Sequence, residues 1–299
     1  MKILTLGTVA LDTVKTPAGK RNNLLGGSAT HFAMSARFFS QTHISAVIGK
    51  DFPKKHISFL RNKGVVVDSL ITASGKTFRW SGDYCSDLNS ACTLDTQLGV
   101  LATFDPSITE SQKKIKNIFL ANVDPDIQDF LLKKIRAPRL VGLDSMNFWI
   151  SQKLQALKRI LKKVDFFVVN DAEARQLSGE TNLLLAAQAL GKLGPAMVII
   201  KKGEHGVIFS SKKFIICLPA FPVTSVVDPT GAGDSFAGGF MGYLSRVNRI
   251  TDSHIRKALA YGTILASFNV EGFGSEKTAT LSQKTIDNRY AYFRKIASW

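Results

Sequence analysis

The sequence VVDPTGAGDSFAGGF, residues 226–240, places two closely spaced glycines and one carboxylate between two apolar stretches. The β-branched residues of 224–227 indicate a strand, and 236–244 indicates a helix whose small residues allow close packing. Gly231 and Gly233 then lie in the turn between the strand and the helix. Ligands of an open parallel sheet bind at the carboxyl ends of its strands, so this turn is the predicted place for chemistry.

The turn has the features of an anion site. Gly231 and Gly233 leave backbone N–H groups unobstructed, and the helix start adds the positive end of its dipole. Asp234 would repel a phosphate at rest, but it could take a proton from a hydroxyl that attacks a phosphorus atom. For an isolated Asp, helix capping is the simpler explanation. Walker A and dinucleotide-binding motifs are excluded, because Leu70 and Phe236 stand where each motif needs glycine.

Over most of its 299 residues the chain alternates short apolar runs with helical patterns. The predicted strands are 3–6, 44–48, 118–121, 140–143, 166–169 and 197–200. Ala29, Phe32, Ala33 and Ala36 follow the spacing of one buried helix face. This alternation predicts an α/β fold, with a mostly parallel sheet covered by helices on both sides.

Two segments break the alternation. Residues 12–24 form two short extended pieces around Pro17-Ala18-Gly19, and 77–84 alternates aromatic and polar side chains, as a strand with one covered face would. They predict a small β-sheet, formed by about 12–24 and 75–100 and inserted in a single domain of residues 1–299. No linker or repeat divides the sequence elsewhere.

The formal net charge is +16, but the basic residues are scattered singly or in pairs. The sequence therefore lacks the clustered basic surface that nucleic-acid binding needs. The three cysteines and five histidines show no metal-ligand spacing. No apolar run approaches the roughly 18 residues of a membrane span, and no signal-peptide pattern is visible. We expect a cytoplasmic protein without nucleic-acid or membrane partners.

The run DPTGAGDSFAGGF, at 228–240, resembles the second signature of the ribokinase (PfkB) family of carbohydrate and nucleoside kinases. In that family the Asp matching Asp234 is the catalytic base, and the backbone of Gly231-Ala232-Gly233-Asp234 forms the anion hole. The resemblance covers nearly the whole chain and implies the ribokinase-like three-layer α/β/α fold. It also implies that the small sheet is a lid, which closes over the substrate and excludes water.

Motifs for the acceptor lie near the N-terminus. Gly26-Gly27-Ser28-Ala29-Thr30-His31 resembles the first family signature, whose glycine backbone approaches sugar hydroxyls. His31 stands where the family usually has Asn, although His can also donate or accept a hydrogen bond. GTVALD, residues 7–12, resembles the family's first strand and turn, so Asp12 is expected to bind two substrate hydroxyls; a solvated turn Asp is the alternative.

Motifs for the nucleotide follow predicted strands. Asn170-Asp171-Ala172-Glu173 matches the family's N-x-x-E, in which Glu173 acts on magnesium through water, and equally matches a helix capping box. Lys202-Gly203-Glu204-His205-Gly206 resembles the loop along the nucleotide, with Lys202 in place of a small hydroxyl residue near its start. From the resemblance, Lys202, Gly203 and Gly206 are expected to bind the nucleotide, while a hairpin turn is the alternative.

Two further resemblances concern a cation and the adenine. Asp228 and Thr230 match positions that help to hold a monovalent cation, such as K⁺, in several family members. The segment 258–268, leading to Gly272-Phe273-Gly274, resembles the adenine-side wall.

The resemblance therefore implies a kinase that uses ATP and Mg²⁺, with K⁺ as a further candidate, to phosphorylate a primary hydroxyl of a sugar or sugar-like substrate. LDSMNFW, residues 143–149, resembles a bacterial branch described only as sugar kinases. A nucleoside such as adenosine is the alternative acceptor, because Phe78, Trp80 and Tyr84 could stack on a base; they could equally cover the small sheet or a homodimer contact. A non-catalytic sugar or nucleotide sensor on the same fold is the remaining alternative.

Overall fold

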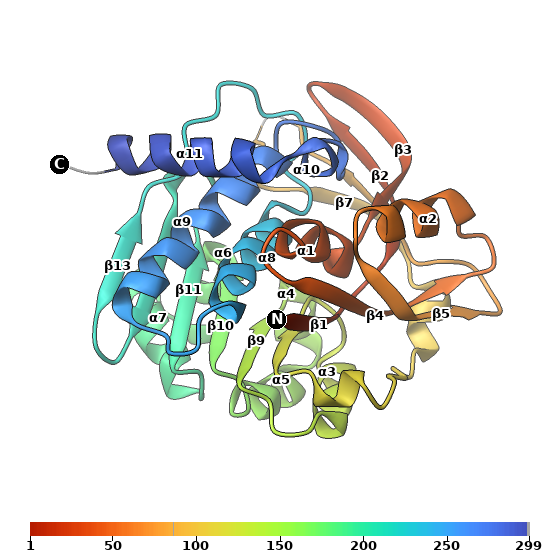
Figure 1. The fold of residues 1–299 in the computed structure, drawn as a ribbon, viewed down its shortest axis with the longest axis horizontal. Helices are drawn as coiled ribbons and strands as arrows, with labels where there is room; N and C mark the ends of the chain where they lie inside the picture. Colours follow the sequence, from red (N-terminus) through yellow and green to blue (C-terminus); the bar gives the residue numbers. More distant parts are fainter. Residues whose placement is uncertain (86, 298–299) are drawn as a thin grey trace.

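A nine-stranded sheet organises the chain, of which the computed structural model describes residues 1–85 and 87–297 (Figure 1). From edge to edge the strands are β13 (Ile215–Leu218), β12 (Val207–Ser211), β11 (Met197–Lys201), β10 (Phe166–Asn170), β9 (Leu140–Asp144), β8 (Asn117–Leu120), β1 (Lys2–Leu6), β4 (Gln41–Gly49) and β5 (Val66–Ala73). Neighbours pair in parallel from β11 to β5, whereas β12 and β13 are antiparallel. This confirms the predicted mostly parallel sheet.

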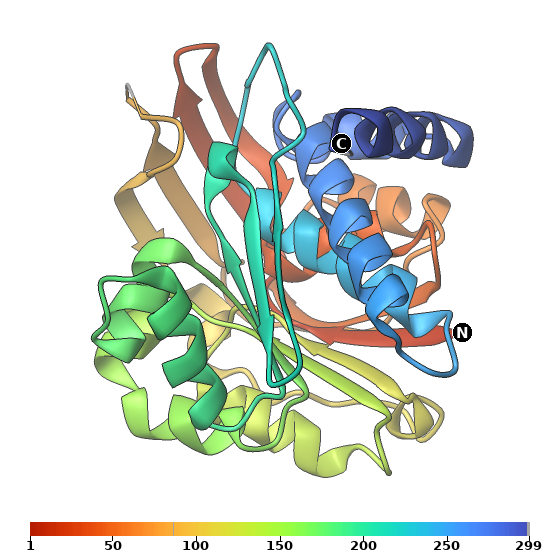
Figure 2. The same cartoon turned by 90° about the vertical axis from the view of Figure 1, so that its left-hand side faces the viewer.

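Helices cover both faces of this sheet (Figure 2). The first layer contains α3 (Pro125–Lys134), α4 (Asn147–Gln152), α5 (Leu154–Leu161), α6 (Asp171–Ser178) and α7 (Leu183–Lys192). The second contains α1 (Ser28–Ala36), α8 (Ala232–Ser245) and α9 (Asp252–Asn269), flanked by α2 (Lys54–Asn62), α10 (Glu276–Thr280) and α11 (Gln283–Ile296). Short 3-10 turns span Gly99–Thr103, Gln112–Lys114 and Gly203–His205. No described helix combines the length and apolarity that a membrane crossing needs.

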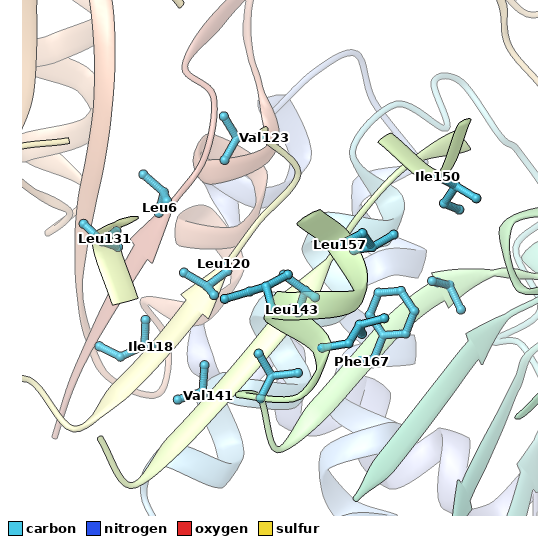
Figure 3. Packing of buried hydrophobic residues seen from close by; sticks show 14 of the residues in the cluster. Leu6, Ile118, Leu120, Val123, Leu131, Val141, Leu143, Ile150, Leu157 and Phe167 are labelled. Atoms are coloured by element: carbon cyan, nitrogen blue, oxygen red, sulfur yellow. The ribbon is translucent and has the colours of Figure 1, made fainter. Parts of the chain in front are cut away.

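Successive buried residues of one strand face opposite helical layers. Phe166 of β10 packs against Phe240 of α8, with ring centroids 5.2 Å apart. The next residue, Phe167, packs on the other face with Leu143 of β9 and Leu157 of α5 (Figure 3). Burying one such side chain contributes about 1.5–3 kcal/mol. Since both faces are buried, the central strands are largely apolar.

A second, small sheet has the order β3-β2-β6-β7. Its strands are β2 (Ala10–Thr16), β3 (Gly19–Gly26), β6 (Arg79–Asp83) and β7 (Cys92–Gln97). β2 pairs in parallel with β6, and the other pairs are antiparallel. The predicted extended segments 12–24 and 77–84 thus meet in one sheet, while residue 86, inside the predicted 75–100, lies outside the described residues.

The β2–β3 hairpin of the small sheet lies against the loop that leads into α8. Thr16 Oγ1 donates a hydrogen bond of 2.8 Å to the carbonyl oxygen of Val227. The Arg21 guanidinium lies over the ring of Phe273, 4.8 Å from its centroid. Segments more than 200 residues apart in the sequence are therefore brought together around the glycine-rich turn.

The predicted strand at 224–227 is wrong. The backbone N–H groups of Val227 and Asp228 donate to the carbonyl oxygen of Val270, which follows α9, and not to a neighbouring strand. The segment is therefore an irregular loop. Helix α8 begins at Ala232, four residues before the predicted 236, so Asp234 belongs to its first turn.

Candidate active site

Three neighbouring parallel strands end in polar residues at one edge of the large sheet. β9 ends at Asp144, β10 at Asn170 and β11 at Lys201, and strand pairing places Asn170 beside Lys201. The Lys201 ammonium lies 3.2 Å from a carboxylate oxygen of Asp144. This carboxyl edge is where ligands of open α/β sheets bind.

The glycine-rich turn lies at the same edge. Gly231, with a φ of 75°, is in the left-handed region and caps α8. A side chain there would also meet the ring of His31. A Cβ added to Gly233 would lie 2.6 Å from the Lys201 Nζ. The left-handed backbone and the His31 ring favour glycine at 231, whereas a side chain at 233 would have to displace the flexible end of Lys201.

The Asp234 carboxyl lies among charged groups. It is partly exposed, and no described residue donates a hydrogen bond to it. Burial raises its pKa well above the ordinary value, the charges of Asp144, Asp12 and Glu173 raise it further, and Lys201 lowers it. An acid with a raised pKa and a free carboxylate suits proton abstraction.

Asn170 and Glu173 form the capping box that begins α6. Asn170 Oδ1 accepts from the Glu173 backbone N–H at 2.7 Å, and Glu173 Oε2 accepts from the Asn170 backbone N–H at 2.8 Å. Burial raises the pKa of Glu173 to about 7, while the charge of Lys201 lowers it. The two residues therefore act as a helix cap and also face the charged cluster.

The cluster has the chemistry expected of a magnesium-phosphate site. The charges of Asp144, Glu173 and Asp234 all act on one ammonium, that of Lys201, so three carboxylates outnumber the cation. Within the described residues, no group of three or more His, Cys, Asp or Glu side chains is arranged to hold a metal ion. Mg²⁺ in phosphoryl-transfer sites keeps several waters and uses only one or two carboxylates with the phosphates. The residues present fit such an ion.

Asp12 forms a buried corner with Gly26 and Gly27. It is 5% exposed, its carboxylate occupies the space of a side chain at Gly26, and it accepts a hydrogen bond from the Gly27 backbone N–H. Burial raises its pKa to about 7, the Gly27 N–H lowers it, and Asp228 raises it. Asp12 is thus not a solvated turn residue, and the motifs at 7–12 and 26–31 meet at one point.

His31 is connected to the glycine-rich turn through the side chain of Asn269. Asn269 Nδ2 donates to the Thr230 carbonyl at 2.7 Å, which leaves Asn269 Oδ1 to accept from Ser235 Oγ at 3.0 Å and from His31 Nδ1 at 3.1 Å. Burial lowers the pKa of His31, so its ring is neutral with the proton on Nδ1. His31 Nε2 is buried and has no partner among the described residues.

Asp228 and Tyr84 both contact Thr230 of the glycine-rich turn. The buried Asp228 carboxylate accepts from the backbone N–H groups of Thr230 and Gly274, both at 2.9 Å. Tyr84, which follows β6, has its hydroxyl 3.3 Å from Thr230 Oγ1. Burial raises the pKa of Tyr84 to about 12, and the charges of Asp228 and Asp12 raise it too, so the phenol faces both carboxylates.

The other two aromatic candidates for base stacking lie elsewhere. The Trp80 ring lies over Gly82 of its own strand and donates to Thr93 Oγ1 at 3.2 Å. Phe78 packs against the core of the large sheet. Only Tyr84 of the three is brought to the charged site.

The loop 202–206 connects β11 to the antiparallel β12, so it is the hairpin that the alternative predicted. Gly203 and Gly206 have φ values of 55° and 81°, which favour glycine. Asn89, in the loop between β6 and β7, donates to Glu204 Oε1 at 3.3 Å. The side chain of Lys202 makes no contact with the charged cluster among the described residues; that of Lys201 does.

Sequence reasoning missed Asp144 and Lys201, although a signal was present. Each follows directly on a predicted strand, at 140–143 and 197–200, as Asn170 does. The carboxyl-edge rule would have found both residues had it been applied to every strand.

The family model for pfkB family carbohydrate kinases matches residues 10–281. The cytidine kinase of Thermococcus kodakarensis is 28% identical over 256 residues, which cover 82% of this chain and 89% of that protein. The nucleoside kinase of Methanocaldococcus jannaschii, an archaeal member of the ribokinase family, superposes with a TM-score of 0.77 at 21% identity, covering 97% of this chain and 98% of that one. The aminoimidazole riboside kinase of Salmonella enterica, solved with aminoimidazole riboside and an ATP analog, has a TM-score of 0.77 at 19% identity, covering 97% and 100%. These superpositions show the same three-layer fold.

Proposed function

Because this chain belongs to the pfkB family of carbohydrate kinases, and is thus an ATP-dependent phosphotransferase, we propose that it phosphorylates a primary hydroxyl of a sugar or sugar-like acceptor, with Asp234 as the base. The observation that carries the proposal is the free Asp234 carboxylate beside the Gly231–Gly233 backbone. Besides burial, the charge of Asp12 also raises the pKa of Asp234, which supports a common site for the two carboxylates.

Asp234 takes the proton of the acceptor hydroxyl as that oxygen attacks the terminal phosphorus of ATP. The bond between phosphorus and the acceptor oxygen forms, the bond to the bridging oxygen breaks, and ADP leaves with the electron pair. The backbone N–H groups of Gly231, Ala232 and Gly233, at the start of α8, stabilise the negative charge on the transferring group. Because phosphoryl transfer asks little covalent chemistry of the protein, position and charge do most of the work.

Asp12 holds the acceptor. A carboxylate can accept from two neighbouring hydroxyls at once, and Gly26 and Gly27 let the acceptor approach the backbone closely. His31 lies next to Gly231, and its Nε2 has no hydrogen-bond partner among the described residues. We propose that Nε2 accepts a hydrogen bond from a substrate hydroxyl, at the position where the family usually has Asn. The small sheet acts as the lid that excludes water.

Glu173 and Asn170 organise magnesium through water, and the 203–206 loop lines the nucleotide. Mg²⁺ held there would neutralise part of the charge of the ATP phosphates. K⁺ is proposed to act at Asp228 and Thr230, which brace the same turn. Activity in K⁺ compared with choline, at equal ionic strength, tests this cation role.

The exposed edge of the small sheet supports a homodimer through the lid. Every residue of β7 is exposed, Leu94 to 63%, and an unpaired strand edge readily pairs with another chain. Sedimentation of the wild-type protein and of Leu94→Lys tests it: a dimer that the substitution dissociates is expected.

A nucleoside is the second candidate acceptor. It is favoured by the cytidine kinase relative, which matches this chain over most of its length. Tyr84 is then the side chain placed to contact a base, since it alone of the three aromatic residues faces the site.

ADP production from Mg·ATP across pentoses, hexoses, their phosphates and nucleosides tests the proposed function, with Asp234→Asn run in parallel. Turnover with one acceptor, lost in the variant, identifies the acceptor class. Binding of ATP or sugar without turnover for any acceptor would favour a sensor instead.

A further inference from the structure

The Lys201 side chain runs along the glycine-rich turn. A Cβ at Gly233 would lie 2.6 Å from Nζ, 3.4 Å from Cε and 3.6 Å from Cδ of Lys201. The ammonium end of the chain therefore takes up the room left by the missing side chain of Gly233. The side chain is only 18% exposed, yet its end lies beside the backbone that faces the transferring group.

Asp144, at the end of β9, holds this ammonium by an ion pair across the intervening strand β10. Its Oδ2 lies 3.2 Å from Nζ, while its Oδ1 accepts from the Ser145 backbone N–H at 2.7 Å. The Asp144 side chain is 6% exposed, and both residues end strands of the rigid central sheet. The charge of Lys201 is thus held at a defined point.

We propose that Lys201 is a further catalytic residue, whose ammonium contacts the phosphoryl group during its transfer, and that Asp144 is its positioning residue. The proposal deepens the function proposed above and rests on it. Lys201 keeps its proton throughout; it adds a full positive charge to the partial charges of the backbone N–H groups.

Charge balance gives the physical reason for such a residue. ATP brings several negative charges to a site that already contains Asp144, Glu173 and Asp234. Charge also spreads over the oxygens of the phosphoryl group as it moves. Replacing a purely structural buried pair by apolar residues is often neutral for stability, so a charge held beside the glycine-rich turn is better explained by the phosphoryl group than by folding.

Lys201→Met tests the proposal, because it keeps the length of the side chain and removes the charge. Its kcat is expected to fall about 100-fold, the size of effect seen when one charge-stabilising donor is removed. Lys201→Arg should recover part of that loss. Lys212→Met, an exposed position in the β12–β13 turn, is the matched control and should keep the wild-type kcat.

Nucleotide binding gives a readout that needs no turnover. If the ammonium contacts the terminal phosphoryl group, Lys201→Met weakens ATP binding at least several-fold more than ADP binding, and Asp144→Asn does so to a smaller extent. A structural role would lower the melting temperature but leave the ATP-to-ADP affinity ratio unchanged.

The outcomes separate the two proposals. Turnover that Asp234→Asn abolishes and Lys201→Met preserves, with an unchanged affinity ratio, overturns the role of Lys201 and leaves the proposed function standing. If the wild type shows no turnover but Lys201→Met changes the ratio of ATP affinity to ADP affinity, the proposed kinase reaction is contradicted. The contact between Lys201 and the phosphate is then still supported. If Lys201→Met does not fold, Asp144→Asn carries the same comparison.

Discussion

Asp234 owes its chemistry to its neighbours. Burial and the Asp144 charge raise its pKa, and Lys201 lowers it; Asp12 and Glu173 are the other carboxylates that face it. The acid limb of kcat/KM is therefore expected well above pH 4, the ordinary range of an Asp. Lys201→Met should move that limb to higher pH, and Asp144→Asn should move it to lower pH. Measured pH–rate profiles that shift in the same direction for both variants would contradict this assignment.

The raised pKa of Asp12 makes the folding stability of the protein depend on pH. Its pKa is about 7 in the folded protein and near 3.9 in an unfolded chain, so the folded state binds the proton more tightly. Its contribution to stability is then present below pH 4 and is lost as the pH rises to about 7. Asp12→Asn should gain stability relative to the wild type across that range. Urea unfolding of both proteins at several pH values checks it.

The placement of site residues was predictable from the sequence where a motif spans adjacent positions, as in Gly231–Asp234. It was not predictable where the contact forms between strands. Lys201 lies 57 residues from its partner Asp144, and their contact depends on the order of β9, β10 and β11 in the sheet. Likewise, His31 was expected only at the substrate, whereas its bond to Asn269 joins positions 238 residues apart.

Gly231 and Gly233, at the start of α8, are glycines for two different reasons. Gly231→Ala meets the His31 ring and requires a left-handed backbone, so it should cost on the order of 1–2 kcal/mol of stability. Gly233→Ala gains helix propensity but displaces the Lys201 ammonium. We expect it to keep the wild-type melting temperature and to lose at least about 10-fold in kcat, since one positioned charge is moved. Thermal melts and steady-state kinetics of both variants test these expectations. A fully active Gly233→Ala would contradict the close approach of the Lys201 ammonium to Gly233.

Six of the nine strands of the large sheet were predicted, because they are mostly apolar on both faces; β5, β12 and β13 were not predicted. The strand expected at 224–227 was wrong, since the backbone of Val227 bonds to Val270 and Thr16, which lie far away in the sequence. Strand β7 shows the opposite case. All of its residues are exposed, so no apolar alternation marks it, and only its pairing with β6 makes it a strand.

At the scale of the molecule, hydrogen bonds join the small sheet and its loops to the rest of the chain, among them Thr16 with Val227, Tyr84 with Thr230, and Asn89 with Glu204. The fold class was predictable from the alternation of strand and helix. These hydrogen bonds were not predictable, because each connects segments distant in the chain.

Thr16→Val removes one of these hydrogen bonds at nearly constant volume. If the small sheet excludes water, ATP hydrolysis without acceptor should rise a few-fold relative to phosphoryl transfer, because the lid opens more often. Thr96→Val, on the exposed β7, is the control. An unchanged ratio of hydrolysis to transfer, measured as phosphate against phosphorylated acceptor, would argue against a lid role.

Single-turnover transfer of labelled terminal phosphate from Mg·ATP to the acceptor, in the wild type and in Asp234→Asn, tests the central claim most directly. We predict rapid labelling of the acceptor by the wild type. Labelling by the variant should be at least about 100-fold slower at equal ATP binding, since the proton acceptor is gone and the shape is kept. Equal rates in the two proteins would show that Asp234 is not the base.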